Sequence, residues 1–189
     1  MVVKVLGLDL SSRECKESGY ALLSLNLEII DLGKFHYNSE ILNFITTQHP
    51  DLVSIDAPLS FGDKGFRKCE KLMLKSGFRV YPTSIKWMSN LTKRGIYIAN
   101  KIRRLGIRVI ETHPTSSLRA AGFKGNYKSN NEVIQFISKR WNLKVKTGTS
   151  RHIVDAVIAA ISGIYYLRNK ALIFKADDGE IVLASSVSI

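Results

Sequence analysis

Three segments rich in β-forming residues each run directly into a carboxylate, and these carboxylates are the side chains best suited to chemistry. In chain order they are Asp9, Asp56 and Glu111, which follow residues 2–8, 53–55 and 107–110. Such apolar runs are typical of strands buried in a sheet, where a charged group is costly unless a cation or several hydrogen-bond donors meet it. If the strands lie side by side, their carboxylates gather at one edge of the sheet and repel one another. Because divalent metal ions are the usual partners of such clusters, the pattern predicts a metal site.

Each of these carboxylates also has a structural interpretation when it is taken alone. Asp9 precedes Ser11 and Ser12 and could cap a turn with them, which is a common role for an aspartate at a strand end. The recurrence of the pattern at Asp56 and Glu111 favours the metal site over three unrelated caps.

A fourth carboxylate, Asp155, is the only acidic residue in the apolar segment 151–168, which is predicted to form a buried helix. His152 precedes Asp155 by three positions and therefore lies on the same face of that helix. The alternative is an aspartate that is favoured near the start of a helix by the helix dipole.

The charge balance indicates a polyanionic partner. The 189 residues include 28 Lys and Arg against 16 Asp and Glu, which gives a formal net charge of +12. Nucleic acid is the leading partner for such a surplus, although a basic protein can carry it without any binding site. A predicted helix over residues 84–105 is rich in Lys and Arg. Its Lys93 and Arg94 could follow a phosphate backbone, and the alternative is an ordinary solvated helix face.

The chain contains no apolar run long enough to span a membrane and no signal peptide at its start. We therefore expect a soluble, cytoplasmic protein with no membrane partner. Its two cysteines, Cys15 and Cys69, lack C-x-x-C spacing, so they support neither a zinc knuckle nor a disulfide framework.

The hydrophobic patterning predicts an α/β fold in which helices flank a mixed five-stranded sheet. An antiparallel meander is expected over residues 2–9, 19–25 and 27–35. A helix that begins at Asn38 or Ser39 then crosses over to a parallel strand ending at Asp56. Further helices are expected over residues 67–74, 84–105, 114–121, 131–140 and 151–168.

The last residues have the pattern of a small hairpin, with strands over 172–175 and 180–184 around an Asp-Asp-Gly turn. We therefore expect one domain over residues 1–170, followed by a C-terminal hairpin or tail over residues 171–189. No internal repeat or low-complexity segment interrupts this division.

This element order is that of the ribonuclease H-like fold, and the chain resembles domain-of-unknown-function family 429, whose members are predicted nucleases of that fold. The resemblance covers residues 2 to about 167. Its motifs are G-L-D-L-S at 7–11, S-I-D-A-P-L at 54–59, R-K-C-E at 67–70, E-T-H-P-T-S-S-L-R at 111–119, Y-K at 127–128 and H-I-V-D-A at 152–156. Glu70 departs from the family pattern, which more often has Asp at that position.

The resemblance implies an enzyme, a nuclease that uses Mg²⁺ or Mn²⁺ to hydrolyse phosphodiester bonds of DNA or RNA. The metal ligands that it implies are Asp9, Asp56, Glu111 and Asp155. His152 is implied as a further catalytic residue that assists proton transfer or ligates the metal. Two ions in such a site would clamp the attacking water and the leaving oxygen of the phosphodiester, with Asp9 bridging both ions.

The resemblance also implies contacts with nucleic acid. Arg67 and Lys128 lie in matched motifs and could steady a phosphate, in addition to Lys93 and Arg94 of the basic helix. The spacing of His152 and Asp155 is similar to that in the last helix of the Holliday-junction resolvases. Because those enzymes work as dimers, a homodimer is expected by analogy.

Two other classes of protein fit part of the pattern. The first is a non-catalytic nucleic-acid-binding protein of the same fold, in which any metal is structural. The second is an ATPase related to actin and the sugar kinases, whose first strand also ends in an aspartate. Such ATPases need glycine-rich loops that bring backbone donors to the nucleotide, and this sequence contains no Gly-Gly motif and no Walker loop.

Overall fold

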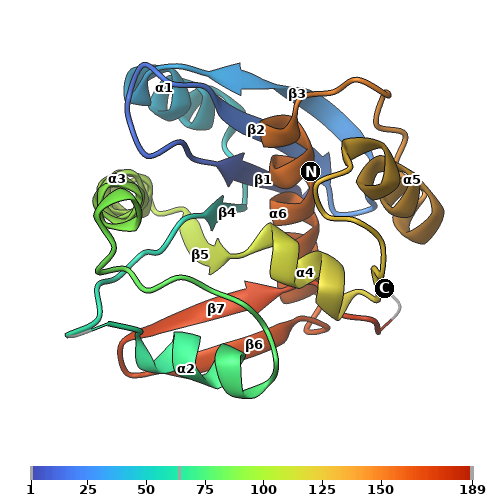
Figure 1. The fold of residues 1–189 in the computed structure, drawn as a ribbon. Helices are drawn as coiled ribbons and strands as arrows, with labels where there is room; N and C mark the ends of the chain where they lie inside the picture. Colours follow the sequence, from blue (N-terminus) through green and yellow to red (C-terminus); the bar gives the residue numbers. More distant parts are fainter. Residues whose placement is uncertain (1, 64, 188–189) are drawn as a thin grey trace.

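The computed structural model describes residues 2–63 and 65–187, which form one mixed β-sheet with helices on both faces (Figure 1). Its strands are β1 (Lys4–Asp9), β2 (Ser18–Ser24), β3 (Ile29–Phe35), β4 (Leu52–Asp56), β5 (Arg108–Thr112), β6 (Leu172–Ala176) and β7 (Gly179–Leu183). Their order in space is β3-β2-β1-β4-β5-β7-β6. The first three strands form an antiparallel meander, β1, β4, β5 and β7 are parallel, and β6 returns antiparallel to β7.

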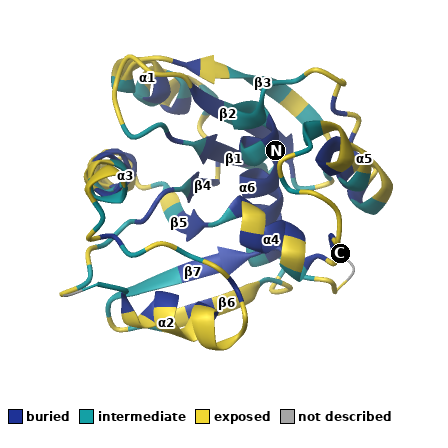
Figure 2. Cartoon of the chain, viewed as in Figure 1, coloured by how far each residue is buried: buried dark blue, intermediate teal, exposed yellow. Residues whose placement is uncertain are grey.

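Helices cover the sheet because its strands carry apolar side chains on both faces. The helices are α1 (Asn38–Gln48), α2 (Lys68–Lys75), α3 (Lys86–Arg104), α4 (Pro114–Ala120), α5 (Asn130–Trp141) and α6 (Arg151–Leu167). On one face, Val5 of β1 shares a buried cluster with Val157 of α6. On the other face, Leu6 of β1 is clustered with Ile41 of α1 and Ile98 of α3. Figure 2 shows the central strands and α6 as the most deeply buried elements.

The C-terminal hairpin extends the sheet. β7 pairs in parallel with β5, where Thr112 lies opposite Val182. Successive residues of β7 enter opposite cores, because Val182 belongs to the α6 cluster while Ile181 and Leu183 pack with Met73 of α2. The predicted mixed sheet with its meander is confirmed, but the prediction of five strands was wrong, since the sheet has seven strands within residues 2–63 and 65–187. The predicted boundary after residue 170 therefore falls within one continuous sheet.

Two glycines let α6 lie directly on the first two strands. A Cβ atom at Gly7 would be 2.0 Å from the carbonyl oxygen of Ala156, and one at Gly19 would be 2.0 Å from that of His152. No side chain fits at either position. This close approach brings the first turns of α6 over the end of β1, where Asp9 lies.

No helix within residues 2–63 and 65–187 is long and apolar enough to cross a membrane. Cys15 is exposed, Cys69 is buried, and both are free thiols.

Candidate active site

The carboxylates of Asp9 and Asp56 end neighbouring strands. β1 and β4 are parallel, and Asp9 lies directly opposite Asp56 in their register. Side chains alternate between the faces of a strand, so both residues share the face of Gly7 and Ser54, which packs against α6. The register therefore places two of the predicted carboxylates side by side.

The start of α6 adds two more groups, His152 and Asp155. The Nδ1 atom of His152 lies 2.6 Å from Oδ2 of Asp9. Oδ2 of Asp155 accepts a hydrogen bond of 2.7 Å from Nε of Arg151. The other oxygen of Asp155 is buried and has no hydrogen-bond partner in the described part of the chain. We call Asp9, Asp56, His152 and Asp155 the Asp9 cluster.

The Asp9 cluster brings three carboxylates into a poorly hydrated place, where Arg151 partly offsets their charge. Burial raises the pKa of Asp56 well above its ordinary value, and the charges of Asp9 and Asp155 raise it further. Burial also raises the pKa of Asp155 to about 6, although Arg151 opposes this shift. The hydrogen bond with Asp9 raises the pKa of His152, because the carboxylate stabilises the imidazolium form. A divalent cation beside these carboxylates would favour their charged forms.

These shifts predict that the metal-free protein is more stable near pH 5 than near pH 7, by about 1 kcal/mol or more. The folded state binds a proton at Asp155 more tightly than the unfolded chain does, so stability falls as the pH rises from 3.8 towards about 6. His152 acts in the same direction, because the stability from its raised pKa is present below the unfolded pKa and is lost as the pH rises through the folded one. Urea unfolding in EDTA at both pH values measures the difference.

The Asp155→Asn variant should show a smaller pH difference than the wild type, because its residue 155 no longer titrates. Asp177→Asn is the matched control, since the Asp177 side chain is 68% exposed and forms a surface ion pair with Lys68. A wild-type protein that is less stable near pH 5 than near pH 7 would contradict the prediction.

Glu111 lies on the opposite face of the sheet from the Asp9 cluster. It is opposite Ile55 of β4 and Ile181 of β7, and these two residues pack towards α1, α3 and α2. Its carboxylate accepts hydrogen bonds from both terminal nitrogens of Arg67, with Nη1 at 2.8 Å from Oε2. The backbone nitrogen of Leu59 donates a further bond of 2.8 Å. Glu111 is therefore tied to Arg67 and stands apart from the predicted partners.

Arg67 lies in the interior, with its side chain only 1% exposed. Besides Glu111, its guanidinium donates to Oε1 of Glu70 and to Oγ of Ser60, both at 2.9 Å. The other oxygen of Glu70 accepts the backbone nitrogen of Arg67 at 2.8 Å and so caps α2. Arg67 thus joins the loop after β4 to β5 and α2, and a phosphate contact would require it to leave these partners. Burial raises the pKa of Glu70, and the charge of Arg67 opposes that shift.

Of the other residues predicted to contact nucleic acid, two lie at the surface and one lies in the interior. Lys93 and Lys128 are exposed. Arg94 is only 7% exposed, and its Nη1 atom donates to the carbonyl oxygen of Ser11 at 2.9 Å and to Oγ of Ser18 at 3.1 Å. The guanidinium of Arg94 therefore anchors the loop between β1 and β2 from inside.

The donor set of the Asp9 cluster fits a divalent metal ion. Carboxylate oxygens are hard ligands that suit Mg²⁺ and Mn²⁺, and imidazole is a common metal ligand. One oxygen of Asp155 is unpartnered among the described residues and so is free to act as a ligand, and burial followed by the charges of Asp9 and Asp155 raises the pKa of Asp56. In this conformation no three His, Cys, Asp or Glu side chains among residues 2–63 and 65–187 are close enough to hold a metal ion. A metal ion held by three of these side chains at once would need them closer together.

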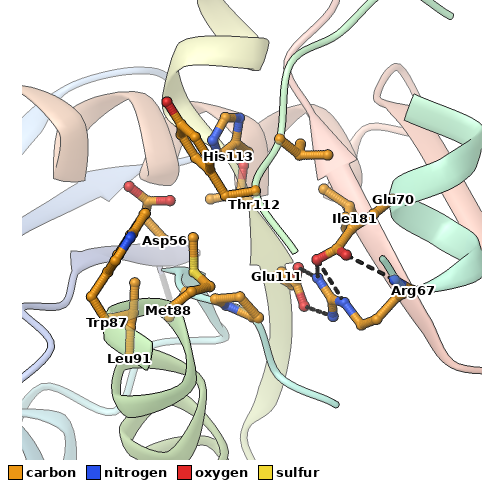
Figure 3. Close-up of a pocket in the computed structure, with 14 residues that line it drawn as sticks. Asp56, Arg67, Glu70, Trp87, Met88, Leu91, Glu111, Thr112, His113 and Ile181 are labelled. Carbon is orange, nitrogen blue, oxygen red and sulfur yellow. Dashed lines mark hydrogen bonds and ion pairs between the residues drawn. The ribbon is translucent and has the colours of Figure 1, made fainter. Parts of the chain in front are cut away.

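A cavity of about 220 Å³ opens beside the Asp9 cluster and shares Asp56 with it. Figure 3 shows Asp56, Trp87 and Met88 on one side of the cavity, and Glu111 with Arg67 on the other. The walls come from the ends of β4 and β5, the start of α3 and the loop before α2. The cavity therefore lies between the two groups of acidic residues.

Sequence reasoning did not predict this cavity. Two large aromatic residues at its rim, Tyr81 and Trp87, are 60% and 49% exposed, and their ring centroids are 5.5 Å apart. The one feature of the sequence that could have indicated it is this pair of aromatic residues, one just before and one just inside a basic helix. Only the folded chain shows that the start of this helix reaches Asp56.

Comparisons with known proteins support the fold. A family model described as "Protein of unknown function (DUF429)" matches residues 7–180. The solved "T. thermophilus RuvC in complex with Holliday junction substrate" aligns with 89% of this chain and 97% of its own, at 15% identity and a TM-score of 0.52. The "Thermus thermophilus RuvC structure" aligns with 89% and 98%, at 12% identity and a TM-score of 0.54. A search of curated protein sequences found no match. The structural likeness confirms the predicted ribonuclease H-like fold.

Proposed function

The chain belongs to the DUF429 family, and from its fold and its Asp9 cluster we propose that it is a metal-dependent nuclease that hydrolyses phosphodiester bonds of nucleic acid. One observation carries the proposal. Asp9 and Asp56 end the neighbouring parallel strands β1 and β4, and Asp155 comes from the start of α6, which packs on the same face of the sheet. A structure that shares the fold, RuvC of T. thermophilus, has been solved with a Holliday junction substrate.

The residues of the Asp9 cluster have different roles in the proposed reaction. Asp9, Asp56 and Asp155 would hold Mg²⁺ or Mn²⁺, which when bound activates water and neutralises charge on the phosphate. His152 is positioned by Asp9 to exchange a proton with water or with the leaving oxygen. Glu111 stays a predicted ligand, and it can join the site only when Arg67 releases it.

We assign the first contacts with the nucleic-acid backbone to α3. Lys86, Lys93, Lys101 and Arg104 are exposed and recur at intervals that keep them on one face of this helix. Such a row attracts phosphates along the helix, and the start of α3 borders the cavity beside Asp56. On the other side of the Asp9 cluster, exposed Lys128 follows Tyr127, whose carbonyl oxygen accepts a bond from Arg151.

A non-catalytic nucleic-acid-binding protein is the second candidate, and two observations favour it. Glu111 is held by Arg67, and no three possible ligands among the described residues are within reach of one metal ion. Such a protein would keep the basic face of α3 and bind the same nucleic acids. It would not cleave them.

Incubation with branched and linear DNA and RNA, in Mg²⁺, Mn²⁺ or EDTA, separates the two candidates. The nuclease proposal predicts cleavage of at least one substrate with a metal ion and none with EDTA, because the carboxylates alone repel the phosphate. Binding of every substrate without cleavage, in either metal, would instead support the non-catalytic protein. The homodimer and the cytoplasmic location stay predictions.

A further inference from the structure

We propose that the cavity beside the Asp9 cluster binds one unpaired nucleobase of the nucleic-acid substrate. The inference rests on the proposed function and specifies its substrate, which must be a strand whose base can leave its stack. Enzymes that act on nucleic acids hold such bases in small pockets, between apolar walls and a few polar groups.

The size and lining of the cavity suit a single base. Its volume of about 220 Å³ is below the roughly 300–1,000 Å³ of sites for larger ligands. Pro58, Met88 and Leu91 give it apolar walls, between which a flat ring system loses its contact with water. The cavity therefore suits one small ring system and excludes a stack of bases.

Aromatic side chains stand at its mouth. Trp87 and Tyr81 lie edge to face, with an angle of 68° between their planes, and both remain about half exposed or more. Large aromatic surfaces left in water beside a cavity are typical of binding sites, because they offer a flat partner for stacking. Stacking on an aromatic ring tolerates any base sequence, since every base has a π-face.

The cavity also offers a polar group for the edge of a base. His113 lines it, and Nδ1 of this residue lies 2.7 Å from Oγ of Ser116. Its other ring nitrogen has no hydrogen-bond partner among the described residues. This free nitrogen can exchange a hydrogen bond with the edge of a base.

The position of the cavity decides what occupies it. Asp56 belongs both to the cavity and to the Asp9 cluster, where the phosphate would react. In a nucleotide only one sugar separates the base from its phosphate, so a base in the cavity leaves that phosphate next to the cluster. The exposed lysines of α3 continue from the same place and can hold the adjoining backbone.

Trp87 fluorescence tests base binding directly. Adenosine or cytidine, which carry no phosphate, should quench the emission of the wild-type protein to a saturable limit. Trp87→Phe should abolish this quenching, because its remaining tryptophan, Trp141, is buried and bonded to Tyr165. Absence of saturable quenching by either nucleoside would overturn the inference.

Abasic substrates test the same cavity during cleavage. In a series of otherwise identical strands, removal of one base next to the cleaved bond should slow cleavage about tenfold. In Trp87→Ala, the same removal should change the rate less than about twofold. Tyr97→Ala is the matched control, because Tyr97 is 48% exposed on the same helix but does not line the cavity.

These results separate the inference from the proposed function. Saturable quenching by nucleosides without cleavage of any strand would contradict the nuclease proposal and support the base site. If no abasic position changes the cleavage rate and no nucleoside quenches the emission, the base site is contradicted and the nuclease proposal is supported.

Discussion

Replacement of Asp9 by asparagine is expected to lower metal-dependent cleavage on the order of 10³-fold or more, while the fold persists. Asp9 is the central residue of the cluster. It is paired with Asp56 in the register of β1 and β4, and its Oδ2 atom lies 2.6 Å from Nδ1 of His152. Asparagine keeps the shape and one acceptor oxygen for His152, but it removes the charge that would hold the metal ion. Cleavage rates of a fluorescent strand in Mg²⁺ and in Mn²⁺ measure the loss.

The stability of Asp9→Asn should stay within about 1 kcal/mol of the wild type, since the lost charge also relieves repulsion at Asp56. Urea unfolding checks this, and it separates a chemical effect from misfolding. Asp177→Asn is the matched control, because it removes a carboxylate from an exposed ion pair with Lys68. Cleavage by Asp9→Asn at the wild-type rate would remove the proposed mechanism and would indicate a contaminating nuclease.

The part of the site that could be predicted from the sequence follows from one rule of sheet geometry. Parallel strands end at the same edge, so Asp9 and Asp56 had to be neighbours if their strands were. The helix pattern drew attention to Asp155 and His152, and a resemblance assigned them to the site. Their place over β1 depends on Gly7 and Gly19, which admit α6. Glycine has no side chain and therefore belongs to no chemical motif. The sequence alone does not indicate that α6 packs this closely on the first two strands.

The position of Glu111 shows where such reasoning ends. Its strand pattern is the same as that of Asp56, but Glu111 pairs with Ile55 instead of with Asp56. A shift of one residue reverses the face on which a side chain lies. Register between distant strands depends on packing across the whole sheet, and a short apolar run does not specify it.

Long-range partners explain the remaining differences. Arg67 and Arg94 are ordinary basic residues in the sequence, yet both are buried because distant oxygen atoms surround their guanidinium groups. The hairpin of β6 and β7 was expected as an appendage because it is short and terminal. It joined the sheet because β7 is apolar on both faces and β5 offered a free edge.

Replacement of Arg67 by methionine is expected to destabilise the protein by about 3–5 kcal/mol, as the loss of one partner from a buried ion pair usually does. Arg67 is 1% exposed, and the side chains of Glu70 and Glu111 beside it are 3% and 6% exposed. Without the guanidinium, both carboxylates remain buried and unpaired. Burial already raises the pKa of Glu70 and Arg67 opposes that shift, so without Arg67 the Glu70 pKa should rise further and the variant should regain stability as the pH falls from 7 towards 5. Urea unfolding at the two pH values measures both effects.

A triple variant, Arg67→Met, Glu70→Met, Glu111→Leu, tests whether the loss of stability comes from buried, unpaired carboxylates. It removes all three charges and fills the same space with apolar side chains, a change that is often neutral or stabilising. We therefore expect it to recover most of the stability lost in Arg67→Met. Arg67→Lys should fall between them, because a lysine keeps the charge but cannot reproduce the paired bonds to Glu111 and the bond to Glu70. A single variant that loses less than about 1 kcal/mol, or a triple variant no more stable than the single one, would contradict this account of the interior.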